Sequence, residues 1–316
     1  MMLELLGLVC WEGFNINYQL SINDYQLNEP LSKHTTFKVG GLADVFVTPQ
    51  NENQLATVLA DCQTNGYDFL VLGNGSNLLV GDGGFRGVVI SLLGLNKIKL
   101  VSDDTIHAEA GASMKDLAEF AQSHGITGFE FAHGIPGSVG GGVYMNAGAY
   151  EGEMKDIFLS ARCINPTGDF VDVNADQMNL AYRKSSAQSQ GLIIATSLFR
   201  GKVGDKGQIT TKMIDLQTRR EEKQPLEMPS AGSTFKRPEG HFAGKLIMDA
   251  GLRGYAIGGA QVSEKHCGFI VNKGGATAKD ILDLISHVQN VVQEKFGILL
   301  ETEVKIVGDK NDNNQT

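Results

Sequence analysis

Residues 134–150 are the segment of the chain whose residue types most clearly suggest a chemical role. They read Gly-Ile-Pro-Gly-Ser-Val-Gly-Gly-Gly-Val-Tyr-Met-Asn-Ala-Gly-Ala-Tyr, with six glycines and no charged residue. Glycine lets another group come close to the backbone because no Cβ intervenes, and successive N–H groups can hold an anion. The apolar residues favour partial burial against a flat ligand. A buried structural loop explains the pattern equally well.

Residues 73–78, Gly-Asn-Gly-Ser-Asn-Leu, form a second glycine-rich segment directly after a predicted strand at Phe69–Leu72. A turn at the end of a strand is a common place to hold a phosphate. Leu78 stands where a Rossmann fingerprint has its third glycine, and a strand pattern follows it, which excludes that site. No G-x-x-x-x-G-K-[ST] motif occurs, which excludes a P-loop NTPase. The two segments together predict loops that hold one extended cofactor.

Arg183 is a candidate ligand for a carboxylate. It follows Tyr182 and precedes an apolar predicted strand at residues 192–196, which favours a partly buried position. A guanidinium there can form two parallel hydrogen bonds with a carboxylate. Most arginines are surface charges, however, and that interpretation stays open.

Ser233 lies in a second candidate cluster, Ala-Gly-Ser-Thr-Phe-Lys-Arg-Pro at residues 231–238. A hydroxyl in a glycine turn, followed by Lys236 and Arg237, suits an anionic substrate. The alternative is an ordinary turn serine.

For several polar residues, an ordinary structural role explains the sequence pattern as well as a functional role does. Lys223 belongs to a group of cations that ends the predicted helix 210–222, where they either complement the helix dipole or hold a diphosphate. Glu303 lies on a predicted strand at 298–307, whose alternation places it on the solvent face. The remaining candidates for a substrate pocket are Gln261, His266 and Asn272.

Hydrophobic periodicity and capping residues predict the elements that position these groups. Beyond the elements already named, we expect helices at Glu52–Asn65, 113–124, 245–250 and 279–296, and strands at 44–48, 78–80, 88–91, 98–101, 106–110 and 267–272.

Composition narrows the class of protein. The formal net charge of −9 argues against a nucleic-acid partner, which needs a basic face. Four widely spaced cysteines fit a reduced cytoplasmic protein better than a disulfide framework, and no metal-ligand spacing occurs. No apolar stretch is long enough to span a bilayer, so we expect no membrane partner. The chain is expected to be a monomer.

The motifs resemble those of the UDP-N-acetylenolpyruvoylglucosamine reductase family, also called UDP-N-acetylmuramate dehydrogenases, in its short-loop subclass. The resemblance rests on residues 134–141 and 145–150, on Tyr182-Arg-Lys-Ser, on residues 231–238 and on Leu300-Glu-Thr-Glu-Val. It covers about residues 28–308. It implies an α+β protein, with a two-subdomain FAD-binding fold of the vanillyl-alcohol oxidase type and a C-terminal α+β substrate-binding domain.

The resemblance also implies noncovalent FAD as cofactor and NADPH as hydride donor. Some oxidases of this superfamily attach flavin through a histidine, but we interpret His133 as a partly buried side chain. The residues that match family contacts to FAD are Val39, Gly40, Gly41, Gly73, Asn74, Gly75, Ser76, Asn77, Leu78, Gly134, Pro136, Gly137, Ser138, Gly140, Gly141, Asn146, Ala147, Gly148 and Ile194.

The implied reaction reduces UDP-N-acetylglucosamine enolpyruvate to UDP-N-acetylmuramate, a cytoplasmic step of peptidoglycan precursor synthesis. Arg183 and Glu303 would stabilise the charge that develops on the substrate, and Ser233 would be the proton donor. Tyr182, Lys223, Lys236 and Arg237 would bind the UDP-sugar. The segment after Arg183 is short, so no substrate-covering tyrosine loop is expected.

Two other functions remain as alternatives: an FAD-linked oxidase on the same fold, and a nonenzymatic module that binds a UDP-sugar or flavin. The expected domains are an N-terminal extension (1–20), two FAD-binding subdomains (21–97 and 98–207), a substrate-binding domain (208–308) and a disordered tail (309–316).

Overall fold

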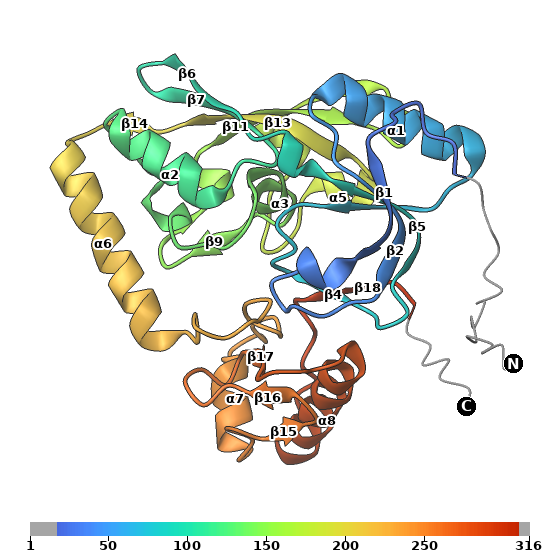
Figure 1. The fold of residues 1–316 in the computed structure, drawn as a ribbon. Helices are drawn as coiled ribbons and strands as arrows, with labels where there is room; N and C mark the ends of the chain where they lie inside the picture. The colour runs from blue at the N-terminus through green and yellow to red at the C-terminus, as the bar shows by residue number, and fades with distance from the viewer. Residues whose placement is uncertain (1–17, 310–316) are drawn as a thin grey trace, which may run out of the picture.

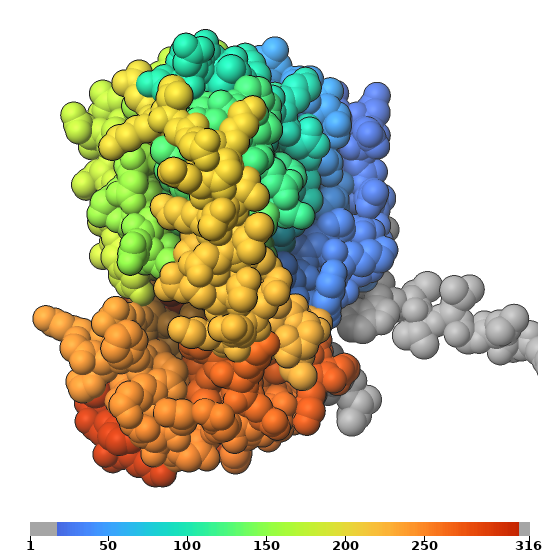
Figure 2. Space-filling model, turned by 90° about the vertical axis from the view of Figure 1, so that its left-hand side faces the viewer, coloured from blue at the N-terminus to red at the C-terminus, as the bar shows by residue number. Residues whose placement is uncertain are grey.

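The computed structural model describes residues 18–309, which form two α+β parts side by side and a third part below them (Figure 1). The predicted N-terminal extension and C-terminal tail therefore lie almost entirely outside the described residues. The long helix α6 (Lys206–Lys223) runs along one side of the molecule from the upper parts to the third part (Figures 1 and 2).

The first part is a mixed sheet with one helix packed on it. Its strand order is β1-β2-β5-β3, antiparallel between β1 and β2 and parallel elsewhere. The helix α1 (Glu52–Asn65) has the predicted bounds, because the Asn51 side chain caps its first turn and Gly66 ends it in the left-handed region at φ 67°. The strands are β1 (Tyr25–Pro30), β2 (Leu42–Val47), β3 (Phe69–Leu72) and β5 (Phe85–Ser91).

The second part is an antiparallel sheet with the strand order β12-β11-β13-β7-β6. The helix α2 (Met114–Ser123) begins after Ser113, whose side chain accepts a hydrogen bond from the backbone N–H of Asp116, as predicted. The strands are β6 (Ile98–Ser102), β7 (Thr105–Glu109), β11 (Phe158–Ile164), β12 (Phe170–Asn174) and β13 (Ile193–Arg200).

The third part packs the helix α8 (Ala278–Phe296) on a small antiparallel sheet, β15-β16-β17. The predicted strand at 267–272 is shorter than expected, because only residues 270–272 pair with β16. The elements here are α7 (Ala243–Asp249), β15 (Ala256–Ile257), β16 (Ala260–Val262) and β17 (Ile270–Asn272).

The last strand returns to the first part of the chain. β18 (Lys305–Val307) pairs in parallel with β4 (Leu78–Val80), directly after the glycine-rich residues 73–78. The predicted strand at 298–307 was therefore wrong for residues 298–304. That segment changes partner on its way: Thr302 bridges Phe235 in the third part, and the ladder with β4 starts only at Lys305.

The hydrophobic cores show where the parts join. Ile209 and Met213 of α6 are buried in the same core as residues of the first two parts, while residues of the third part form a separate core that also includes Phe37, Val39 and Leu79 of the first part. We therefore propose that the third domain begins after α6, later than the expected boundary at residue 208.

The remaining described elements are short and lie in the connections. They are β8 (Ile126–Thr127), β9 (Gly148–Ala149), β10 (Gly152–Glu153), β14 (Lys202–Val203), α3 (Val139–Tyr144), α4 (Ala175–Met178), α5 (Ser186–Gln190) and four 3₁₀ turns at Leu31–Lys33, Leu92–Gly94, Glu130–Ala132 and Met154–Asp156.

Candidate active site

A cavity of about 810 Å³ lies where the three parts meet. Both glycine-rich segments line it, and so do the three candidate catalytic residues Arg183, Ser233 and Glu303. Its volume is within the range of about 300–1,000 Å³ that ligand pockets usually have. The predicted cofactor residues that line it are Gly73, Asn74, Gly75, Ser76, Asn77, Leu78, Pro136, Gly137, Ser138, Gly141, Ala147 and Gly148.

The two glycine-rich segments touch each other across one wall of the cavity. A Cβ built on Gly73 would lie 2.2 Å from Ser138 Oγ, so only glycine permits this approach. The Asn74 side chain also donates a hydrogen bond to the Pro136 carbonyl, at 2.9 Å. The result is a wall of closely packed backbone, which fits an extended ligand such as FAD.

The glycine content of residues 134–150 predicted a loop throughout, but the structure has a short helix within this segment. Ser138 caps a short helix, α3, by accepting a hydrogen bond from the Gly141 N–H. Part of the glycine run serves packing: a Cβ on Gly140 would lie 2.7 Å from the Ala110 Cβ, and one on Gly142 would lie 2.7 Å from Met114 Sδ. The small residues thus bring α3 close to the second sheet.

Arg183 sits in a strained two-residue turn. Ala181 and Lys184 exchange both backbone hydrogen bonds, each 3.0 Å long. Arg183 has a φ of 56°, in the left-handed region where the third position of such a turn normally takes glycine or asparagine. This conformation costs about 1–2 kcal/mol for an ordinary residue. Strain of this kind is typical of residues held for function.

Glu303 and Arg183 form an ion pair inside the cavity. The distance from Arg183 Nε to Glu303 Oε1 is 2.5 Å, and only 14% of the glutamate side chain is exposed. Glu303 thus lies inward, opposite to the solvent face that strand alternation predicted. Burial raises the pKa of Glu303 above its ordinary value, and the neighbouring Arg183 opposes this effect only in part.

Glu303 is held by all three parts of the molecule. Its backbone N–H donates to the Thr234 carbonyl at 2.8 Å, and its own carbonyl accepts from the Asn77 side chain at 3.2 Å. Arg183 supplies the third contact, from the second part. The position of this carboxylate therefore depends on the arrangement of the whole chain.

Ser233 lines the same cavity from the third part. It follows Gly232, which has a φ of 71° and can take this conformation without strain. Within residues 18–309 the Ser233 hydroxyl makes no hydrogen bond, so it is free to contact a ligand. Lys236, three residues later, forms an ion pair with Glu301 at 2.9 Å.

A second cavity, of about 570 Å³, adjoins the first at Arg183, which lines both. The predicted substrate residues Tyr182, Lys236 and Arg237 line this second cavity. The Arg237 guanidinium also lies over the Phe242 ring, 3.9 Å from its centroid. A ligand that spans both cavities would have its two ends on opposite sides of Arg183.

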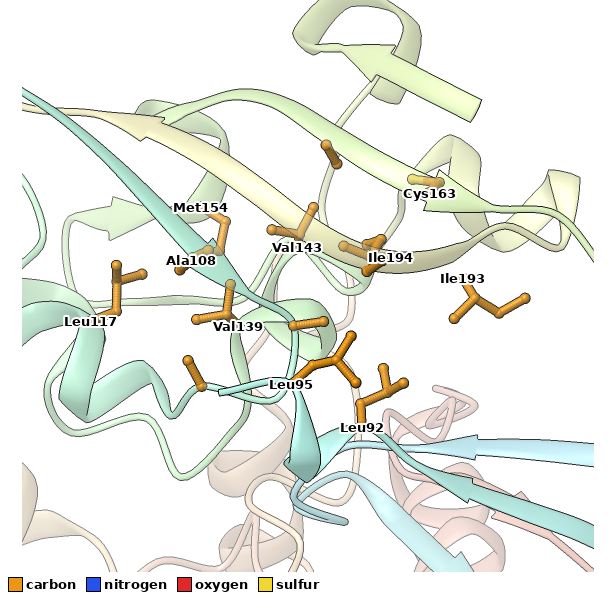
Figure 3. Packing of buried hydrophobic residues seen from close by; sticks show 14 of the residues in the cluster. Leu92, Leu95, Ala108, Leu117, Val139, Val143, Met154, Cys163, Ile193 and Ile194 are labelled. Carbon is orange, nitrogen blue, oxygen red and sulfur yellow. The ribbon is translucent and has the colours of Figure 1, made fainter. Parts of the chain in front are cut away.

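Several predicted cofactor residues do not line either cavity, because packing or internal hydrogen bonds occupy them. A Cβ on Gly41 would lie 2.2 Å from the Asp82 carbonyl oxygen, and Gly134 leaves room for Arg220. Ile194 is buried in the core beside Val143 (Figure 3). The full group outside the cavity walls is Val39, Gly40, Gly41, Gly134, Gly140, Asn146 and Ile194.

Four predicted substrate residues likewise lie outside both cavity walls. Gln261 donates to the Gly254 carbonyl, and Asn272 donates to the Phe37 carbonyl. His266 Nδ1 accepts from the Gly268 N–H, and burial lowers its pKa. Lys223 is exposed at the end of α6. His133 is also absent from these walls, and its Nε2 lies 3.4 Å from Glu119.

Sequence reasoning missed Arg220 as an individual cavity residue. It lines the cavity, is only 6% exposed and donates to the Gly134 carbonyl, and no carboxylate among the described residues pairs with it. Burial lowers its pKa. The cation cluster at the end of α6 was the available signal, but the cluster alone did not show which member points inward. Further lining residues that were not among the predicted site residues include Thr36, Lys38, Tyr144, Met145, Tyr150, Phe269 and Lys305.

Within residues 18–309, no helix is long and apolar enough to cross a membrane, and no group of three or more His, Cys, Asp or Glu could hold a metal ion. The cysteines Cys62, Cys163 and Cys267 are free and buried.

Comparison with known proteins identifies the family. A family model described as the C-terminal domain of UDP-N-acetylenolpyruvoylglucosamine reductase matches residues 224–307, and one described as an FAD binding domain matches residues 43–174. The reductase of that name from Clostridium kluyveri is 52% identical over 301 residues, which are 95% of this chain and 99% of that protein. The chain belongs to the UDP-N-acetylenolpyruvoylglucosamine reductase family.

Further relatives agree with this assignment. The Clostridium perfringens reductase is 50% identical over 285 residues, 90% of this chain and 93% of that protein. The crystal structure of the Thermus caldophilus reductase matches with a TM-score of 0.77 and 34% identity, over 90% of this chain and 98% of that one. These matches confirm the predicted fold and the expected FAD cofactor of a UDP-N-acetylenolpyruvoylglucosamine reductase.

The contact between Gly73 and Ser138 generates the first prediction. Gly73→Ala places a methyl group against Ser138 Oγ, so one of the two cavity segments must move. We expect the affinity for FAD to fall about tenfold or more, which corresponds to ~1.4 kcal/mol. Flavin absorbance per protein and titration of the stripped protein with FAD measure this. Gly207→Ala, in the exposed first turn of α6, is the control, and wild-type affinity in Gly73→Ala would contradict the prediction.

The second prediction concerns stability and pH. Because burial raises the pKa of Glu303 above 4.5, the folded state keeps this proton to higher pH than the unfolded chain does. The resulting stabilisation is present below pH 4.5 and is lost as the pH rises through the folded pKa. Glu303→Gln should therefore gain stability relative to wild type as the pH rises from about 4.5 towards 7 in urea unfolding. The exposed Glu294→Gln should show no such trend; an equal trend in both variants would refute the assignment.

Proposed function

We propose that Arg183, Glu303 and Ser233 carry out the family reaction in this chain, the reduction of UDP-N-acetylglucosamine enolpyruvate to UDP-N-acetylmuramate. The chain is an FAD-dependent oxidoreductase of peptidoglycan precursor synthesis, with NADPH as hydride donor. The observation that carries the residue assignment is the Arg183–Glu303 ion pair, which faces a cavity walled by the glycine-rich segments.

The cofactor would be held by residues 73–78 and by Pro136, Gly137, Ser138 and Gly141. Their backbone forms the closely packed wall, and the buried Arg220 adds a positive charge without a carboxylate partner among the described residues. When bound, the FAD would supply the chemistry of hydride transfer between NADPH and the β-carbon of the enolpyruvyl group.

Arg183 and Glu303 would act on the substrate's carboxylate end. Arrival of the hydride places negative charge on the α-carbon and the carboxylate of the substrate. The Arg183 guanidinium stabilises this charge directly, and its strained turn holds it in place before the reaction. Glu303 orients the guanidinium through their ion pair.

Ser233 would complete the reaction as proton donor. Ser233 lines the cavity, and its hydroxyl is free of hydrogen bonds to other described residues. An aliphatic hydroxyl is a poor acid, but the carbanionic α-carbon is a strongly basic acceptor. Transfer of the hydroxyl proton to that carbon gives UDP-N-acetylmuramate and leaves an alkoxide, which solvent protonates again.

The second cavity would hold the nucleotide end of the substrate. Tyr182, Lys236 and Arg237 line it, and the two cations suit a diphosphate. We further propose that the enzyme works as a monomer in the cytoplasm, where its nucleotide substrate and NADPH are found.

The assay that tests the function measures NADPH consumption. Turnover should require the enolpyruvyl substrate, and NADPH-reduced enzyme should reoxidise slowly in aerated buffer. Rapid reoxidation by oxygen would favour the FAD-linked oxidase instead. Binding of UDP-sugar without any NADPH consumption would favour the nonenzymatic module.

The third prediction concerns Arg183. Arg183→Met removes a contact made chiefly to the charge that develops during reaction, so kcat should fall about 10²–10³-fold while KM changes little. Steady-state kinetics measure both constants. Arg200→Met, which removes an exposed guanidinium, is the control. Wild-type kcat in Arg183→Met would make Arg183 a structural residue.

The fourth prediction separates the two half-reactions at Ser233. Transfer of a hydride from NADPH needs no proton from Ser233. In Ser233→Ala, NADPH should therefore reduce and bleach the flavin at nearly the wild-type rate. Reoxidation of the flavin by the enolpyruvyl substrate should slow by about 10²-fold or more. Ser233→Cys, which keeps a proton, should recover part of the loss. Stopped-flow flavin absorbance follows both steps; slow bleaching with normal reoxidation would overturn the assignment.

A further inference from the structure

The turn that carries Arg183 is unfavourable on its own. Its two backbone hydrogen bonds join Ala181 and Lys184, and Arg183 between them has a φ of 56°. A non-glycine residue stays in this conformation only where its surroundings hold it there. The contacts around the turn therefore decide where the guanidinium lies.

Gln188, on the short helix α5, holds the turn from one side. Its side-chain amide donates to the Arg183 carbonyl at 3.2 Å and to the Tyr144 carbonyl at 2.7 Å. Both partners are carbonyl oxygens, so the amide nitrogen must face them. The side chain thus joins the Arg183 backbone to the end of α3.

Asn146 holds the turn from the other side. Its side-chain nitrogen donates to the Ala181 carbonyl at 3.2 Å and to Glu153 Oε2 at 3.0 Å, and its oxygen accepts from the Lys155 N–H at 2.9 Å. The residue is 0% exposed. Its amide is used by these three protein contacts, and it does not line the cavity.

Both amides connect the turn to the same glycine-rich segment, residues 134–150. Tyr144, whose carbonyl Gln188 contacts, and Asn146 follow Pro136, Gly137, Ser138 and Gly141 in the same glycine-rich segment, and those four residues line the cofactor cavity. The Arg183 turn is therefore built onto the back of the cofactor wall.

We propose that Gln188 and Asn146 are positioning residues that hold the Arg183 guanidinium in register with the cofactor wall. The inference rests on the proposed role of Arg183. Neither residue touches the reacting atoms; each acts through the backbone of the turn. A misplacement of about 1 Å is enough to slow a reaction about 10²-fold, so loss of one anchor should appear in the rate.

A double-mutant cycle tests the proposal. Gln188→Met keeps the size of the side chain and removes its hydrogen bonds. In the otherwise wild-type enzyme it should slow reoxidation by the enolpyruvyl substrate roughly 10-fold or more, with bleaching by NADPH unchanged. In the Arg183→Met background it should cause no further slowing. Gln190→Met, on the exposed side of the same helix, should leave both steps at the wild-type rate.

The pH profile supplies an independent readout. Arg183 lowers the pKa of Glu303, against the larger effect of burial. A displaced guanidinium lowers it less, so Gln188→Met should move the Glu303 limb of the rate profile to higher pH. The limb is recognised by its absence in Glu303→Gln. A merely structural role for Gln188 would not move it.

The outcomes are distinct. Equal slowing by Gln188→Met in both backgrounds, slowed bleaching by NADPH, or wild-type kinetics would each overturn the positioning role. Wild-type kinetics in Arg183→Met itself would instead overturn the proposed function of Arg183. Asn146→Asp, which keeps the shape but loses the donor to Ala181, should repeat the Gln188 pattern; if this buried variant does not fold, the Gln188 cycle decides.

Discussion

A carboxylate that is mostly shielded from water must be held by its neighbours, and Glu303 is held by all three parts of this molecule. Arg183 pairs with its side chain, Thr234 accepts its N–H, and Asn77 donates to its carbonyl. Removing one partner from a buried ion pair leaves an uncompensated charge and is strongly destabilising. The site therefore exists only when the three parts keep a fixed arrangement.

Polar contacts between the parts maintain that arrangement. Asp82, in the first part, accepts hydrogen bonds from the N–H groups of Ala278 and Lys279 at the start of α8. Asn272, in the third part, donates to the Phe37 carbonyl. Such contacts explain why some polar residues near the family motifs face protein rather than the cavity. They support the site by fixing the third part against the first.

Local signals predicted most of the helices and several strands, because caps, glycines and apolar periodicity act within a few residues. Asn51 and Gly66 bound α1, for example, as expected. The failures involve partners that are distant in sequence. The strand expected at 298–307 is formed only in part, because its neighbours change along its length. Likewise, no local pattern indicated that the side-chain amides of Asn146 and Gln261 donate hydrogen bonds to backbone carbonyls. The resemblance placed the catalytic candidates, while strand alternation alone had put Glu303 in solvent.

The parallel pairing of β18 with β4 also has a consequence for the order of assembly on the ribosome. Asn77 and the Glu303 carbonyl that it contacts are 226 residues apart in the chain. Both glycine-rich walls of the cavity emerge during translation well before the glutamate does. Contacts so far apart in sequence slow folding because the loop between them must close first, and the glutamate leaves the ribosome only after the residues of both cofactor walls. The pair of Arg183 and Glu303 can form only after the glutamate has been made, and the strand that follows it, β18, pairs with β4 in a separate two-stranded sheet.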